Sequence, residues 1–157
     1  MATSIRPPVE GDLTGWQSLW ESYLVFYEAD LPVEETRVLW QRILDPAHPI
    51  SCRLAERKGR LVGLVHFFPH PDTWSHRLTC YLQDLYVDEL IRGEGVGAEL
   101  IETVVDYARE EGWSGVYWLT AEDNHQARVL YDKLTGGTSG FIAYELNTDT
   151  ARPEPRT

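Results

Sequence analysis

Three glycines occur within five residues, directly before a run of apolar residues at helical spacing. The segment reads Arg92-Gly93-Glu94-Gly95-Val96-Gly97-Ala98 and follows a strand-like stretch. Glycines let a backbone approach a ligand closely and turn successive N–H groups toward it. A helix that begins there adds the positive end of its dipole, and Arg92 adds a charged donor. The segment predicts a site for a phosphate or pyrophosphate; the alternative is a tight turn that merely requires glycine.

Two nucleotide-binding motifs with glycine-rich turns do not fit this segment. The P-loop needs Lys and then Ser or Thr after its last glycine, and here Ala98 and Glu99 follow Gly97. The dinucleotide fingerprint has another glycine spacing and follows the first strand of its domain, whereas several strand-like segments precede Arg92. The predicted anion site therefore belongs to neither of these classes.

A carboxylate lies within the strand-like stretch that leads to the glycines. Alternation along a strand places Asp84 on the same face as Leu82 and Tyr86. The opposite face then carries Gln83, Leu85 and Val87. A carboxylate among apolar neighbours requires a reason. Three are open: it binds a cationic substrate, it relays a proton through water, or it accepts structural hydrogen bonds.

The elements that must position these residues follow from the spacing of apolar side chains. Helical spacing predicts helices from Leu13, from Pro32, from Leu100 to Gly112, and from Asn124. Strand-like segments are Ile5 with its neighbours, Ser51–Glu56, Leu61–Phe68, Thr79–Val87, Val116–Thr120 and Phe141–Leu146. A hairpin turn is expected at Arg57–Arg60 and a loop at Pro69–His76. This order predicts a mixed α/β sheet with one right-handed crossover.

The glycine segment and a second motif together resemble a known family. Arg-x-x-Gly-x-Gly after a strand ending in Val87, followed by Asn124, Ala127 and Tyr131 in an Asn-x-x-Ala-x-x-x-Tyr pattern, resembles the GCN5-related N-acetyltransferases. The similarity covers Tyr81–Tyr144, a little under half of the chain. More narrowly, it resembles the branch with the yeast histone/polyamine and D-amino-acid acetyltransferases. The resemblance implies a mostly antiparallel sheet with splayed middle strands, flanked by about four helices.

The resemblance also implies the co-substrate and its contacts. Acetyl-CoA would place its pyrophosphate on the turn from Arg92 to Ala98 and its pantetheine arm along the strand. The strand positions that carry over are Leu85, Tyr86 and Val87, and those of the later helix are Asn124, Ala127 and Tyr131. Asn124 either binds the pantetheine arm or caps its own helix. Glu94 stands where the family often has a basic or neutral residue, so we expect its side chain to point to solvent.

The implied chemistry is direct attack of an amine on the acetyl thioester within a ternary complex. An alkyl-ammonium has a pKa near ~10 and must first lose a proton, for which Asp84 is the first candidate base and Glu89 a lesser one. A backbone N–H around Leu85–Val87 would stabilise the oxyanion. Tyr131 would protonate the departing thiolate. From helical periodicity alone, Tyr131 is an ordinary core residue; the family spacing favours the catalytic role.

Composition sets the remaining expectations. The chain has 157 residues and a formal net charge of -11. We expect one domain over 1–147 with a frayed tail over 148–157. The acidity disfavours nucleic acid as a ligand; it either attracts cationic substrates or serves only solubility. Neither a membrane span nor a signal peptide is expected, so the default location is cytoplasmic. Related enzymes are often dimers, which leaves a homodimer open.

Neither cysteine nor histidine spacing predicts other chemistry. Cys52 and Cys80 form no CxxC pair and are interpreted as buried thiols. The five histidines fit no zinc pattern, so no metal is expected.

The sequence thus predicts an N-acetyltransferase that acts on a primary amine of a small molecule, such as a polyamine or an amino acid. The alternatives are a protein or peptide N-acetyltransferase and a non-catalytic acetyl-CoA-binding module.

Overall fold

The computed structural model describes residues 2–149 and divides into two compact units. The N-terminal unit extends to Leu119, and the C-terminal unit begins at Thr120. The predicted single domain over 1–147 stays a prediction, and the predicted tail over 148–157 falls almost entirely outside the described residues.

The N-terminal unit holds a five-stranded sheet in the order β1-β2-β3-β4-β5. All neighbouring strands are antiparallel except β4 and β5, which are parallel. This arrangement confirms the predicted mixed, mostly antiparallel sheet. The strands are β1 (Ser4–Arg6), β2 (Ser51–Arg57), β3 (Arg60–Asp72), β4 (Ser75–Val87) and β5 (Val116–Tyr117). The helices are η1 (Glu10–Asp12), α1 (Leu13–Phe26), α2 (Val33–Leu44), η2 (Glu89–Ile91) and α3 (Val96–Glu111).

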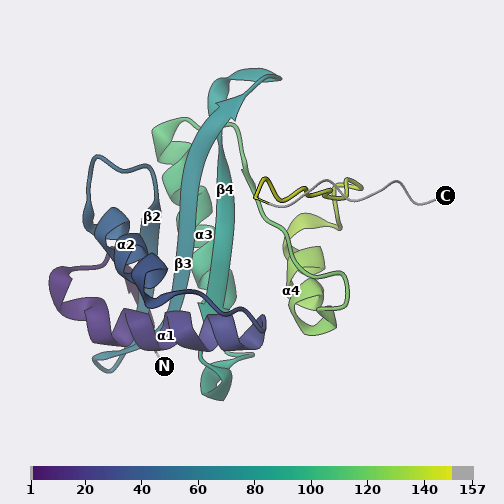
Figure 1. Ribbon diagram of the computed structural model, residues 1–157. Coiled ribbons are helices and arrows are strands. Elements are labelled where there is room, and N and C mark those ends of the chain that lie inside the picture. The colour runs from purple at the N-terminus through teal and green to yellow at the C-terminus, as the bar shows by residue number, and fades with distance from the viewer. Residues whose placement is uncertain (1, 150–157) are drawn as a thin grey trace. The chain divides into compact units, whose positions relative to one another are not determined.

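Helices cover both faces of this sheet (Figure 1). α1 and α2 lie on one face over an aromatic-rich core, and α3 lies behind the strands on the other. The core under α1 and α2 consists of Trp16, Leu19, Trp20, Trp40, Ile43, Cys52, Leu54, Leu64 and Tyr86. On the opposite face, a Cβ at Gly63 would lie 3.1 Å from Leu100 Cδ1. The absence of a side chain at Gly63 therefore lets α3 pack closely against the sheet.

The two hairpins differ in how well the sequence predicts them. Between β2 and β3, Lys58 and Gly59 both have positive φ, at 50° and 73°, as a two-residue turn requires, so this prediction is confirmed. The loop predicted at Pro69–His76 is wrong, because β3 and β4 continue through this region. β2 pairs with β3 only as far as Phe67, so Pro69 lies where β3 has a free edge. A proline is tolerated at such a position.

A β-bulge changes which face each residue of β4 occupies. His66 pairs with Asp84, but Phe67 pairs with Leu82, so Gln83 is an extra residue. Leu82 therefore shares a face with Phe67, whose ring lies 5.9 Å from that of Tyr107 in α3. The prediction that Asp84 and Leu82 share a face is wrong. Asp84 and Tyr86 do share one, on the side of α1.

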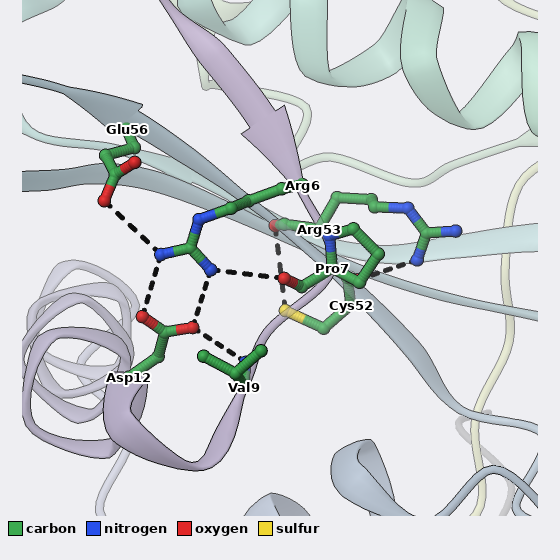
Figure 2. A network of polar contacts seen from close by, with 7 residues as sticks. All are labelled: Arg6, Pro7, Val9, Asp12, Cys52, Arg53 and Glu56. Atoms are coloured by element: carbon green, nitrogen blue, oxygen red, sulfur yellow. Dashed lines mark hydrogen bonds and ion pairs between the residues drawn. The ribbon is translucent and has the colours of Figure 1, made fainter. Parts of the chain in front are cut away.

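A polar network attaches the start of α1 to the edge of the sheet (Figure 2). Arg6 of β1 donates to both carboxylate oxygens of Asp12, at 2.7 and 2.9 Å. It also reaches Glu56 of β2 at 3.4 Å. The backbone N–H of Val9 donates to Oδ2 of Asp12 at 2.8 Å. These bonds fix where α1 enters the fold, and with it the residues that α1 carries toward β4.

The C-terminal unit contains α4 (His125–Thr135), as predicted. Asn124 is its N-cap: the side-chain Oδ1 accepts from the backbone N–H of Ala127 at 3.4 Å. Gly136 ends the helix with φ 85°. The strand predicted at Phe141–Leu146 is wrong: no strand forms there, and its large apolar side chains are exposed. An alternating pattern needs a partner strand to bury its apolar face.

β5 is limited to Val116–Tyr117, so the strand predicted over Val116–Thr120 is too long by three residues. No helix within residues 2–149 combines the length and the hydropathy that a membrane span requires.

Candidate active site

The backbone of the glycine turn forms an open cradle at the start of α3. Gly93 and Gly95 have φ of 84° and 90°, backbone conformations that residues other than glycine rarely adopt. A Cβ at either position would meet no atom within 4 Å, so the surface of the turn is open. The first helical hydrogen bond of α3 runs from the N–H of Glu99 to the oxygen of Gly95, at 3.0 Å. The N–H groups of Val96, Gly97 and Ala98 precede it and have no acceptor in the helix ladder.

Arg92 fixes the beginning of this turn. Its Nε donates to the backbone oxygen of Val87 at 3.1 Å. The guanidinium carbon lies 5.3 Å from the ring centre of Tyr86 and 5.5 Å from that of Phe26. Such cation–π contacts hold the side chain between β4 and α1. Direct contact of Arg92 with a phosphate stays a prediction.

Glu94 lies between the two glycines and has a partner that no sequence pattern indicates. Its side chain is 51% exposed, and its Oε1 accepts from Nη1 of Arg57 at 3.2 Å. The Arg57 side chain is 8% exposed and also donates from Nε to the hydroxyl of Thr3 at 2.8 Å. The half-exposed Glu94 carboxylate is therefore paired with a fixed, buried cation at the end of β2.

Asp84 is the centre of a hydrogen-bonded chain that crosses from α1 to β4. Its Oδ1 accepts from the hydroxyl of Tyr23 at 2.6 Å, and its Oδ2 lies 3.0 Å from Nδ1 of His66. On the far side of the imidazole, Nε2 of His66 lies 3.0 Å from Nε1 of Trp16. The carboxylate has a side-chain exposure of 13%, and the His66 side chain has 3%.

The chemistry of these groups fixes where the protons lie. An indole N–H can only donate, so Nε2 of His66 accepts from Trp16 and carries no proton. The single imidazole proton is then on Nδ1 and is donated to Asp84. Burial, and then the negative charge of Asp84, raise the pKa of Tyr23, which therefore remains a neutral donor. Each oxygen of the Asp84 carboxylate thus receives one hydrogen bond, from Tyr23 and from His66.

The strand around Asp84 is open along one edge. β5 pairs with β4 only at Cys80 and Tyr81. Among the described residues, Leu82–Val87 has no strand partner on that side. Leu85, Tyr86 and Val87 therefore lie on a stretch of β4 with an unpaired edge, which fits the expectation of splayed middle strands. A ligand with an extended amide chain can add to such an edge.

A groove of about 630 Å³ lies near the end of β4 but is separate from Asp84. α1 contributes Ser22 and Phe26 to its lining, and the segment around η2 contributes Glu89 and Leu90. Neither Asp84 nor any residue of 92–98 lines it. The groove therefore contains the strand position Tyr86 and the lesser candidate base Glu89, but neither Asp84 nor the glycine turn.

The structure places the predicted site residues in two groups. The N-terminal unit holds Asp84–Val87 and Arg92–Ala98, joined by η2. The C-terminal unit holds Asn124, Ala127 and Tyr131 on α4. The Asn124 amide is used locally: besides capping the helix, it donates from Nδ2 to the hydroxyl of Thr120 at 3.4 Å. Of the two roles left open for Asn124, the geometry shows the cap.

The cysteines and histidines form no second centre in the described part of the chain. Cys52 and Cys80 are both buried, and burial raises the pKa of the Cys80 thiol to about 11. Neither is therefore an activated nucleophile. Among residues 2–149, no group of three or more His, Cys, Asp or Glu side chains could hold a metal ion.

A mixed sheet whose fourth strand leads through a glycine cradle into a helix fits an acyl-coenzyme A-dependent transferase. The chain belongs to the Acetyltransferase (GNAT) family, whose sequence profile matches residues 16–136. It is therefore an N-acetyltransferase with acetyl-CoA as co-substrate, and the predicted family and fold are confirmed.

The chain aligns with two relatives over most of their length. The chain is 36% identical over 138 residues to the D-amino-acid N-acetyltransferase HPA3 of Saccharomyces cerevisiae, covering 87% of this chain and 85% of that protein. It is 26% identical over 145 residues to the N-acetyltransferase YhfO of Bacillus subtilis, whose function is uncharacterised, covering 92% and 97%.

Solved structures share the fold at lower identity. The aminoglycoside acetyltransferase AAC(6')-Iy, bound to a bisubstrate analogue of coenzyme A, matches with a TM-score of 0.81 at 16% identity, covering 94% of this chain and 99% of that one. The ribosomal-protein-alanine N-acetyltransferase of Brucella melitensis biovar Abortus 2308 matches with a TM-score of 0.77 at 21% identity, covering 94% and 99%. These identities support the fold alone.

Proposed function

We propose that this enzyme acetylates the primary amine of a small molecule, an amino acid or a polyamine, by direct attack on acetyl-CoA. The observation that carries the proposal is Asp84, a carboxylate held by Tyr23 and His66 on a strand with an open edge. A carboxylate in this state can bind an ammonium group or accept its proton. The similarity to a D-amino-acid acetyltransferase supports a small acceptor.

The residues of the turn fit the diphosphate part of coenzyme A. The open backbone at Gly93 and Gly95 leaves room for a bulky anion, and the N–H groups at 96–98 supply donors at the positive end of α3. Along β4, the unpaired edge of Leu85–Val87 suits the amide-bearing pantetheine arm. From α4, Asn124, Ala127 and Tyr131 carry the contacts that the family motif implies.

The bound co-substrate supplies an acetyl thioester, and the chain supplies the proton transfers. The acceptor amine, with a pKa near ~10, gives up its proton to Asp84, directly or through a water. A backbone N–H of Leu85–Val87 donates to the carbonyl oxygen as negative charge develops on it. The Tyr131 phenol donates its proton to the sulfur as the thiolate leaves. The cytoplasmic location and the homodimer stay predictions.

The test is an acceptor panel with thiol release as the readout. Purified protein with acetyl-CoA would be offered D- and L-amino acids, diamines, polyamines and a basic peptide with a free N-terminus. We expect turnover on at least one class of free amine and products acetylated on nitrogen, identified by mass spectrometry. Turnover confined to the peptide, or no turnover on any amine when titration shows that coenzyme A binds, would contradict the proposal.

A further inference from the structure

We propose that Arg57 is a positioning residue that holds the Glu94 carboxylate away from the bound pyrophosphate and so sets the affinity for coenzyme A. The inference rests on the proposed role of the glycine turn. It concerns the ion pair between Arg57 on β2 and Glu94 in the turn, and the glycine motif does not predict this pair.

The backbone of the turn gives Glu94 little freedom to avoid an anion. It stands between Gly93 and Gly95, whose positive φ values fix the path of the chain on both sides. The same turn presents the donors at 96–98. A carboxylate in the centre of an anion site repels the ligand unless something directs it elsewhere or neutralises it.

Arg57 supplies both the direction and the neutralising charge. It stands at the end of β2 with its side chain 8% exposed, and two hydrogen bonds orient the guanidinium: Nε to Thr3 and Nη1 to Glu94. A buried guanidinium with its conformation fixed costs little further entropy when it holds a carboxylate. Among the described residues, Glu94 is the only carboxylate within ion-pair distance of Arg57.

The surrounding charges do not take over this role. Arg60 is paired with Asp88, on the other side of η2. Arg92 is held between the rings of Phe26 and Tyr86. If Arg57 is removed, the charge of Glu94 is therefore left without a partner beside the phosphates. One uncompensated charge within a Debye length of a diphosphate changes affinity by roughly three- to tenfold at low salt.

The experiment measures the dissociation constant of coenzyme A by calorimetric titration, which requires no knowledge of the acceptor. Arg57→Met and Glu94→Asp both release a carboxylate into the turn, the second because the shorter side chain no longer reaches Arg57. Glu94→Gln and the double variant Arg57→Met/Glu94→Gln carry no carboxylate there. Arg109→Met removes an arginine that is 75% exposed and pairs with Asp106 on α3, so it controls for net charge.

We expect Arg57→Met and Glu94→Asp to weaken coenzyme A binding roughly three- to tenfold at about 0.05 M salt. At about 0.5 M salt, the difference in dissociation constant between each variant and the wild type should shrink. The double variant and Arg109→Met should stay within about twofold of the wild type, whereas Glu94→Gln, which leaves the Arg57 charge unpaired, should bind coenzyme A as tightly as the wild type or more tightly. Glu94→Asp changes only a half-exposed side chain, so it keeps the test valid if Arg57→Met does not fold.

Two results would overturn the inference. One is a double variant that binds as weakly as Arg57→Met, because the loss is then structural rather than due to the charge of Glu94. The other is a Glu94→Asp variant that binds like the wild type. A different result would overturn the underlying assignment of the turn: wild-type protein that binds pantetheine, which lacks the pyrophosphate, as tightly as coenzyme A.

Discussion

Asp84 lies on β4 and receives two hydrogen bonds, and neither donor belongs to β4. Tyr23 reaches it from α1, and His66 reaches it across the β3–β4 ladder. Trp16 in turn fixes which nitrogen of His66 carries the proton. The network keeps the Asp84 carboxylate oriented, which suits a base or an ammonium-binding group. The same network also leaves it only partly exposed.

Replacing Asp84 by Asn tests whether this charge acts on the acceptor. The amide keeps the size of the side chain and can still accept from His66, so the fold should survive. We expect kcat/KM for the best amine to fall about 100-fold, within the range for a lost general base, with the coenzyme A dissociation constant unchanged. Tyr23→Phe is the matched control, because it removes one donor and keeps the charge; it should cost less than tenfold. Equal losses in both variants would assign Asp84 a structural role only.

Replacing Tyr131 by Phe tests the proposed acid. The change removes one hydroxyl from α4 and leaves the ring. Steady-state kinetics should show kcat lowered by tenfold or more, which is about 1.4 kcal/mol in the barrier, with little change in the acceptor KM. Tyr144→Phe makes the same change at a side chain that is 90% exposed and should have no effect. If Tyr131→Phe turns over like the wild type, the phenol is not the proton donor.

At the scale of elements, the turn between β4 and α3 depends on two glycines with positive φ. Gly95 lies directly before the first residue of α3, and φ of 90° there directs the N–H groups of the first turn outward. A Cβ at this position would have space, but the backbone conformation would be strained. A substitution can therefore distort the cradle without any steric clash.

Gly95→Ala should weaken coenzyme A binding by at least tenfold while lowering stability by about 1 to 2 kcal/mol. Gly59→Ala is a close control, because Gly59 has φ of 73° and equally open surroundings but lies in the β2–β3 hairpin. It should cost similar stability, measured by urea denaturation, and leave coenzyme A binding intact. A Gly59→Ala variant that loses binding to the same extent would show that strain alone, and not the cradle, explains the loss.

The attachment of α1 predicts a dependence of stability on pH. The hydrogen bonds from Arg6, and then the one from Val9, hold the pKa of Asp12 below its ordinary value. A carboxylate with a lowered folded-state pKa contributes stability above its ordinary pKa of ~3.9 and loses it as pH falls through the folded value. Asp12→Asn should therefore cost about 1 to 2 kcal/mol near pH 7, with the difference from wild type shrinking below about pH 4.

Urea denaturation at several pH values measures this difference. The control is Glu34→Gln, which breaks the exposed pair with Arg37 and should leave stability unchanged within error. A difference between Asp12→Asn and the wild type that stays constant from pH 7 to pH 3 would contradict the assignment, because it would not depend on the carboxylate charge.

Most elements were predictable because local patterns determine them. Helical spacing identified α1, α2, α3 and α4, and Lys58-Gly59 identified the first hairpin. The errors fall where neighbours decide. Pro69 is compatible with a strand only because β2 ends opposite Phe67, and Gln83 is a bulge only because of its register with β3. Tyr23 and His66 lie 61 and 18 positions from Asp84, and Arg57 lies 37 positions from Glu94, so no spacing rule joins these pairs.

At the scale of the whole molecule, the formal net charge of -11 sets the electrostatic field that an acceptor meets. Such a field attracts cations and repels anions over roughly a Debye length, about 10 Å at 0.1 M salt. An amine carrying two positive charges would be drawn to the protein, whereas a zwitterionic amino acid has no net charge to be attracted. The alternative is that the acidity only keeps the protein soluble.

The salt dependence of turnover separates these two interpretations. With acetyl-CoA saturating, kcat/KM for a diamine should fall roughly three- to tenfold between about 0.02 and 0.5 M salt, because screening removes the attraction. For a zwitterionic amino acid, the change should stay within about twofold, which makes it the internal control. If the diamine shows the same weak dependence, the net charge does not steer substrate, and acceptor choice then depends on local groups such as Asp84.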